Sequence, residues 1–150
     1  MKAMDVFFHW AQVRGELLQA LDRLDDAQLD FVPGPGLWSV GDTVRHIANA
    51  EEGWFRYGVE RQYEEWPPAY SAADYPTVAA IKQLLADVHA QTEAYLAPLT
   101  WEDLETVIET PWGRKRPLKW IVWHVIDHEI HHRGEVFLML GLMGVAAPDI

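Results

Sequence analysis

The sequence contains no cysteine and only a small share of basic residues. The missing cysteines exclude disulfides, thiolate metal ligands and a cysteine nucleophile, and they fit a cytosolic protein. Lysine and arginine together number 12 against 23 acidic residues, which gives a formal net charge of −11. Because nucleic-acid binders neutralise phosphates with basic side chains, we expect no nucleic-acid partner.

Membrane insertion is not indicated either. The longest apolar run, residues 136–147, contains two glycines and is shorter than the roughly 20 residues that span a bilayer. The first residues, MKAMDVFFHWAQ, lack the apolar core and the small-residue cleavage site of a signal peptide. We therefore expect a cytoplasmic protein without a membrane partner.

The residues that are present favour one globular domain over residues 1–150. The hydrophobic share is 49%, with eight tryptophans, which suffices for a packed core in a chain of this length. Apolar residues recur at helical spacing in four segments, and prolines and glycines interrupt them at 31–36 and 64–76. We predict helices over residues 4–24, 39–60, 77–96 and from 117 to 141 or 144, with a helical turn at 101–104 and a hairpin or extended loop at 106–118.

These helices predict an all-α fold, a four-helix bundle. The connections after the second and third helices are long, so the helices need not alternate simply in direction. The eight tryptophans and the apolar flank Ile126, Ile130 and Phe137 of the last helix would suit a homodimer interface. Core packing explains the same residues equally well.

Four of the seven histidines fall within nine residues on the last predicted helix. Its apolar residues share a stripe roughly 120° wide, since each residue advances about 100° around a helix. His128 and His132 lie inside that stripe, His124 lies at its margin and His131 outside it. Two imidazoles four residues apart point the same way and can hold one metal ion. They can also be core histidines bonded to carboxylates.

A metal site needs a third ligand from another helix, and His46 is the best candidate. On its helix, His46 lies on the same face as Ile47, Ala50 and Trp54. A second apolar stripe on another face of this helix could face the core instead. Glu51 and Glu52 are substitutes for it or ordinary surface charges. The remaining histidines, His9 and His89, lack a same-face partner and are interpreted as structural or exposed.

Two segments resemble a known family. The run WHVIDHEIHHRGEVFLMLGLMG at 123–144 is similar to the closing helix of the DinB-like superfamily (the DinB, YfiT and DfsB group), and WSVGDTVRHIANAEEGWF at 38–55 is similar to its second helix. The resemblance extends over nearly the whole chain in length and helix order. It implies the DinB/YfiT-like bundle and a metal triad made of His46, His128 and His132.

Three neutral imidazoles would leave an open position on a divalent ion, as in catalytic zinc sites. Nitrogen ligands suit zinc or nickel among other metals, and such an ion polarises carbonyls or activates water. The resemblance adds a low-molecular-weight thiol as a cofactor, because members of the family include thiol-dependent transferases. We therefore predict a metal-dependent transferase or hydrolase acting on a small-molecule substrate.

Three further residues are candidates around the metal. Glu129 lies in the buried stripe and would act as a catalytic base, orient a ligand ring, or pair with Arg133 or another cation. Where relatives often read HHRGQ, this chain reads HHRGE, so Glu135 adds an anion near the site. Glu135 and His131 are predicted to support the ligands through hydrogen bonds. The alternative functions are a non-catalytic, stress-associated metal-binding module and a helical dimerisation protein.

Overall fold

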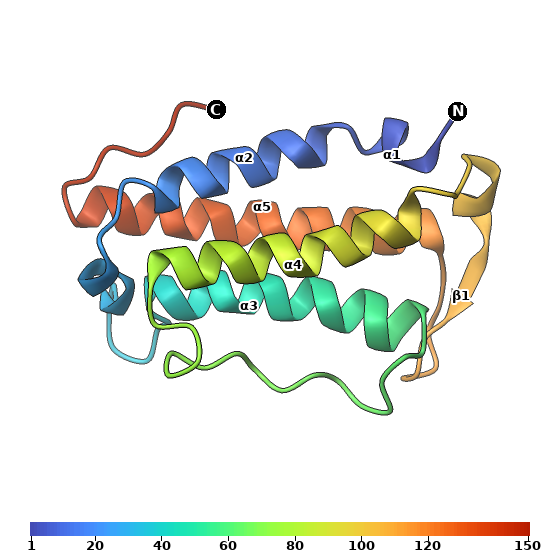
Figure 1. Cartoon of the computed structure of the whole chain (residues 1–150), viewed down its shortest axis with the longest axis horizontal. Coiled ribbons are helices and arrows are strands. Elements are labelled where there is room, and N and C mark those ends of the chain that lie inside the picture. The colour runs from blue at the N-terminus through green and yellow to red at the C-terminus, as the bar shows by residue number, and fades with distance from the viewer.

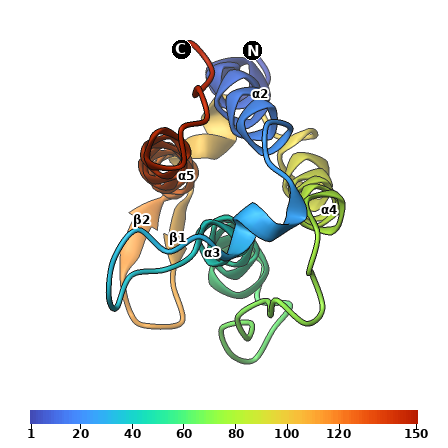
Figure 2. The same cartoon turned by 90° about the vertical axis from the view of Figure 1, so that its left-hand side faces the viewer.

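The computed structural model describes residues 1–150 as a bundle of four long helices with a hairpin at one end (Figure 1). The long helices are α2 (His9–Leu21), α3 (Val40–Glu52), α4 (Val78–Leu96) and α5 (Leu118–Leu142). Viewed along the bundle, α3 lies between α4 and α5, and α2 lies across from α3 (Figure 2). The predicted all-α four-helix fold is confirmed.

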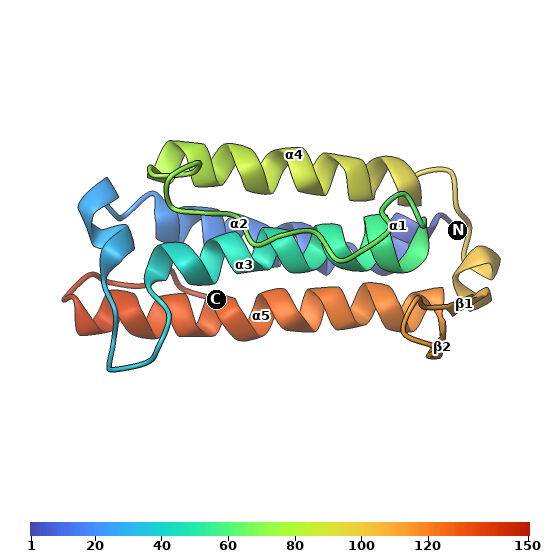
Figure 3. The same cartoon turned by 90° about the horizontal axis from the view of Figure 1, so that it is seen from below.

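The direction of the helices does not alternate along the chain. α3 and α4 are neighbours that run the same way, because the connection over residues 60–77 returns along the length of α3 (Figures 1 and 3). α5 runs in the opposite direction beside α3. The long connections that the sequence shows are therefore what makes this non-alternating topology possible.

The helices begin and end where local chemistry favours it. Ser39 Oγ accepts a hydrogen bond from the amide of Asp42 at 3.0 Å, and Thr77 Oγ1 accepts one from the amide of Ala80 at 3.1 Å. Gly144, with φ +75°, follows the end of α5. α3 continues without a break into a wider, π-helical segment, η2 (Gly53–Val59), so this helical stretch ends close to the predicted residue 60.

The single helix predicted over residues 4–24 is wrong in two respects: the chain forms two helices there, and the second ends earlier, at Leu21. The structure divides it into α1 (Ala3–Val6) and α2, with a turn at residues 7–8. The first residues are tied instead to the segment after α4, since the amide of Ala3 donates to Leu99 O and the amide of Trp101 donates to Met1 O. A short helix, η1 (Asp26–Asp30), also forms where none was predicted.

The hairpin that the sequence offered as one of two possibilities is present. β1 (Val107–Glu109) pairs antiparallel with β2 (Lys115–Pro117), and Ile108 stands opposite Arg116. η3 (Glu102–Glu105) lies one residue beyond the predicted turn at 101–104. Since α5 starts directly after β2, the hairpin fixes where the histidine-bearing helix enters the bundle.

The buried apolar residues form two clusters, one towards each end of the bundle. A polar layer separates them, because Arg14, Glu51 and Glu129 fall between the two sets on their helices and are almost fully buried. Ile126 is fully buried in the chain's own core, so its suggested part in a dimer contact is wrong. None of the helices combines the length and the hydropathy that crossing a bilayer requires.

Candidate metal centre

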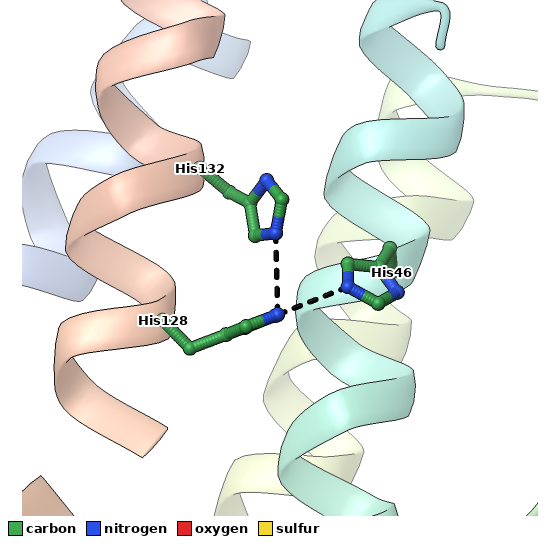
Figure 4. A group of neighbouring side chains, drawn as sticks. All are labelled: His46, His128 and His132. Atoms are coloured by element: carbon green, nitrogen blue, oxygen red, sulfur yellow. Dashed lines mark hydrogen bonds between the residues drawn. The ribbon is translucent and has the colours of Figure 1, made fainter. Parts of the chain in front are cut away.

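Three imidazoles meet between α3 and α5 (Figure 4). His46 Nε2 lies 2.9 Å from His128 Nε2, and His132 Nε2 lies 3.2 Å from the same atom. Two nitrogens bound to one tetrahedral zinc at about 2.1 Å are about 3.4 Å apart. The donor atoms of this histidine cluster (His46, His128, His132) are therefore spaced much as a shared ion requires.

The packing of α3 explains why His46 faces α5. α4, α5 and the 60–77 connection enclose α3, so residues of both of its competing apolar stripes are buried, including Val44 and Ile47. His46 is left on the side between α3 and α5. On α5, the four-residue spacing of His128 and His132 places both rings opposite it.

The rings of His128 and His46 are held in their neutral form. Burial, together with repulsion from His132 and His46, lowers the pKa of His128 to about 3. Burial is also the main cause that lowers the pKa of His46, again with a contribution from His132. Neutral imidazoles are the form that binds metal ions.

Glu135 fixes the orientation of one ring. Its Oε2 lies 2.7 Å from His132 Nδ1. Because a carboxylate only accepts hydrogen bonds, Nδ1 carries the proton and Nε2 keeps its lone pair directed towards His128. His131 is exposed; its Nε2 lies 3.2 Å from Glu135 Oε1, and its ring lies edge-on to that of His132, with 4.9 Å between centroids.

Trp38 is a part of the site that the sequence reasoning missed. Its ring lies edge-on to His46, with 4.6 Å between centroids, and stacks near His132 at 6.2 Å. The signal for it was its place directly before Ser39, the capping residue of the helix that carries His46. Trp38 is half-exposed, so it forms a wall between the cluster and solvent.

The structure does not bring Glu129 to the histidine cluster as a catalytic base. Glu129 is 1% exposed, and Arg14 Nε donates to its Oε1 at 2.6 Å. Its Oε2 accepts from Trp10 Nε1 at 2.8 Å and from Arg14 Nη2 at 3.0 Å. Of its three predicted roles, the structure supports ion pairing, with Arg14 in place of Arg133 as the cation.

Glu51 belongs to the same buried ion network (Arg14, Glu51, Glu129, His89). Glu51 accepts from Arg14 Nη2 and lies against His89 Nδ1, both at 2.8 Å. Burial alone would raise the pKa of Glu51, but Arg14 and His89 hold it at about 2. Because Glu51 is bonded to Arg14 and His89, the prediction that it could replace His46 as the third metal ligand is wrong. The signal for the network was a charged residue, Arg14, placed four residues after Trp10 on an apolar stripe.

The structure is therefore an all-α four-helix bundle with a candidate metal site, made of three histidines, between α3 and α5. The chain belongs to the DinB superfamily, whose family model matches residues 9–136. The superfamily that the sequence resembles is thereby confirmed. No functionally curated protein matches the chain.

Solved structures of bacterial proteins share the fold over nearly the whole chain. A DinB-like protein from Bacillus cereus is 20% identical, with 96% of this chain and 94% of that chain covered and a TM-score of 0.73. The DinB-like protein YjoA from Bacillus subtilis is 19% identical, with coverages of 97% and 96% and a TM-score of 0.73. YfiT from Bacillus subtilis, described as a probable metal-dependent hydrolase with an unusual four-helix bundle topology, is 21% identical, with coverages of 91% and 85% and a TM-score of 0.71.

Proposed function

We propose that this protein is a metal-dependent enzyme whose single divalent ion, zinc or nickel, is held by His46, His128 and His132. The observation that carries the proposal is the convergence of three Nε2 atoms, with neighbouring distances of 2.9 and 3.2 Å. These three histidines form one group of possible metal ligands, and His132 also belongs to a second, more exposed group with His131 and Glu135. Three protein ligands leave one position for water or substrate, as in catalytic zinc sites.

A divalent ion so held supplies Lewis-acid chemistry, polarising a carbonyl and lowering the pKa of water. The protein's own residues prepare the place for it. Glu135 holds the proton of His132 on Nδ1, and burial keeps His128 and His46 neutral. The ring of Trp38 lies against the rings of His46 and His132. YfiT, which has this fold, is described as a probable metal-dependent hydrolase, and we therefore favour hydrolysis of a small molecule.

Thiol-dependent transfer is the second candidate. A cavity of about 240 Å³ adjoins His46 and is lined by Trp38, Asp42, Asn49, Ala69 and Tyr70. Such a space beside a ligand ring would admit a low-molecular-weight thiol next to the ion. In the transfer reaction the thiol would occupy this cavity. Hydrolysis needs only water as a second reactant, and water does not need the cavity.

Metal analysis tests the proposed centre. Protein purified without a histidine tag is expected to contain about one divalent ion per chain by mass spectrometry of the elements. His128→Ala and His46→Ala are expected to lose the ion, whereas His9→Ala, at an exposed histidine away from the cluster, is the control and is expected to keep it. Full metal content in the first two variants would refute the site.

Activity assays separate the candidate reactions. We expect metal-dependent hydrolysis in a panel of small esters and amides, and no turnover after chelation. Conjugation of an electrophile only when a thiol is added would favour the transferase instead. No metal-dependent turnover in either panel, in protein with a full complement of metal, would favour the non-catalytic binding module.

A further inference from the structure

A second cavity, of about 410 Å³, opens beside His132 between the loop before α3 and the last turns of α5. Small-molecule sites are typically about 300–1,000 Å³ and mostly apolar, with a few polar groups at one end. This cavity has that composition. Its lining consists of Pro33, Gly36, Leu37, Trp38, Thr43, His132, Glu135, Leu138 and Met139.

The polar groups of this apolar cavity lie at the end next to the histidine cluster. His132 and Glu135 occupy that end, while Leu138 and Met139 follow along α5. Seven residues of helix separate His132 from Met139, a distance of roughly 10 Å along the axis. The hydroxyl of Thr43 donates to Ser39 O at 2.8 Å, so it is already used within α3.

The far end is apolar and uncovered. Leu37 is 60% exposed and Leu138 is 65% exposed, and both line the cavity. Exposed apolar side chains that gather around a cavity are typical of a ligand site. The lining contains no lysine or arginine, and its one carboxylate, Glu135, would repel an anionic group.

We propose that this apolar cavity binds the hydrocarbon chain of the substrate, whose polar, reactive head then lies at the histidine cluster. The proposal rests on the proposed metal centre and adds the substrate class, a small acyl or alkyl compound with an uncharged apolar chain. The head reaches the open position of the ion past His132. The chain extends along α5 towards Leu37 and Leu138.

A series of alkyl hydroxamates tests the substrate class. The hydroxamate group binds divalent metals, and the chain is lengthened from acetohydroxamate to octanohydroxamate. Each methylene that leaves water on binding is expected to strengthen binding about fourfold, until the chain fills the cavity. Isothermal titration calorimetry on the metal-loaded protein measures the dissociation constants without relying on turnover.

Two leucines on α5 provide the variant and its control. Leu138→Asp places a charge in the cavity wall and is expected to abolish the gain with chain length, while acetohydroxamate binding and metal content stay unchanged. Leu142→Asp carries the same change one turn further on, at a residue that is 57% exposed and lies outside the lining, and is expected to keep the gain. Both side chains are mostly exposed, so both variants are expected to fold.

The outcomes separate the two proposals. If metal and acetohydroxamate bind but longer chains bind no better, the cavity proposal is overturned and the metal centre stands. If the protein binds no metal, the proposed function fails, and the cavity is judged with 1-alkanols on metal-free protein by NMR shifts of the Met139 methyl group. The cavity proposal is supported if longer alkanols bind the wild-type protein more tightly and Leu138→Asp removes this gain. It is overturned if the wild-type protein and Leu138→Asp bind the alkanols equally.

Discussion

A single hydrogen bond determines how His132 presents its ring nitrogens. Glu135 accepts a hydrogen bond from the Nδ1–H group of His132, which leaves Nε2 free to bind an ion. Glu135→Ala is therefore expected to weaken metal binding by about 10–100-fold, a range typical of such supporting residues. Glu135→Gln keeps an accepting oxygen and is expected to lose less.

Competition with a chromophoric chelator measures these affinities. Asp127→Ala, an exposed acidic residue on the same helix, is the control for the loss of one negative charge. Equal affinity in wild-type protein and Glu135→Ala would contradict the orienting role. An equal loss in Asp127→Ala would show that the effect is general electrostatics.

Arg14 is the cation on which the buried ion network depends. It pairs with Glu51 at 2.8 Å and with Glu129 at 2.6 Å, and all three side chains are nearly inaccessible. Arg14→Met would leave two buried carboxylates without their partner, at a cost of about 3–5 kcal/mol in the free energy of unfolding. Urea denaturation measures the loss, and Arg23→Met, at an exposed arginine, is expected to change stability by less than about 1 kcal/mol.

The same network predicts an acid sensitivity. The pKa of Glu51, about 2, lies below its ordinary value of 4.5, so the folded protein holds this proton less tightly than the unfolded chain. The resulting stabilisation is complete above pH 4.5 and is lost as the pH falls towards 2. The stability difference between wild-type protein and Glu51→Gln is therefore expected to shrink between pH 5 and 2.5 in urea titrations. A difference that stays constant over that range would contradict the role assigned to Glu51.

At the scale of helices and strands, the sequence predicts what local periodicity and capping determine. The bounds of α4 and α5 follow from Thr77 at one start and Pro117 at the other. The break at residues 7–8 was not predicted. The residues before it, 1–3, pair with the distant segment 99–101, a contact that local periodicity does not show. The orientation of His46 also depends on tertiary packing. α3 has two apolar stripes, and only the assembled bundle determines which neighbouring element each stripe packs against.

The same distinction applies to the candidate site. The spacing of His128 and His132 is a local property of α5, and the sequence shows it directly. The partner of Glu129 is not local, since Arg14 lies 115 residues away. Trp38 was missed for a similar reason, because its contact with His132 exists only when the loop before α3 packs against α5.

The glycine at the start of the wide segment η2 lies directly against the ring of Trp66. A Cβ at Gly53 would overlap the indole of Trp66, whose Nε1 donates to Asn49 Oδ1 at 3.0 Å. Gly53→Ala is expected to displace that indole and to cost about 1–3 kcal/mol in the free energy of unfolding. Gly15→Ala is the control, because nothing lies within 4 Å of its Cβ, and the helical alanine is expected to raise stability by up to about 1 kcal/mol.

At the scale of the whole molecule, the candidate centre joins two helices that the chain itself connects only distantly. α3 and α5 are separated in sequence by the 60–77 connection, α4 and the hairpin. A ligand that binds only the folded state stabilises it by about 4 kcal/mol when present at 1,000 times its dissociation constant. An ion held by His46 from α3 and by His128 and His132 from α5 would therefore stabilise the whole bundle.

Removal of the ion is accordingly expected to lower the melting temperature by about 10 °C, since 1 kcal/mol corresponds to about 2–4 °C in a chain of this size. Scanning calorimetry with and without a chelator measures the shift. His46→Ala cannot bridge the two helices through the ion and is expected to melt at the same temperature under both conditions. His9→Ala, at an exposed ring near the start of α2, is expected to show the full shift. A chelator effect of equal size in His46→Ala would mean that the stabilising ion binds somewhere other than between α3 and α5.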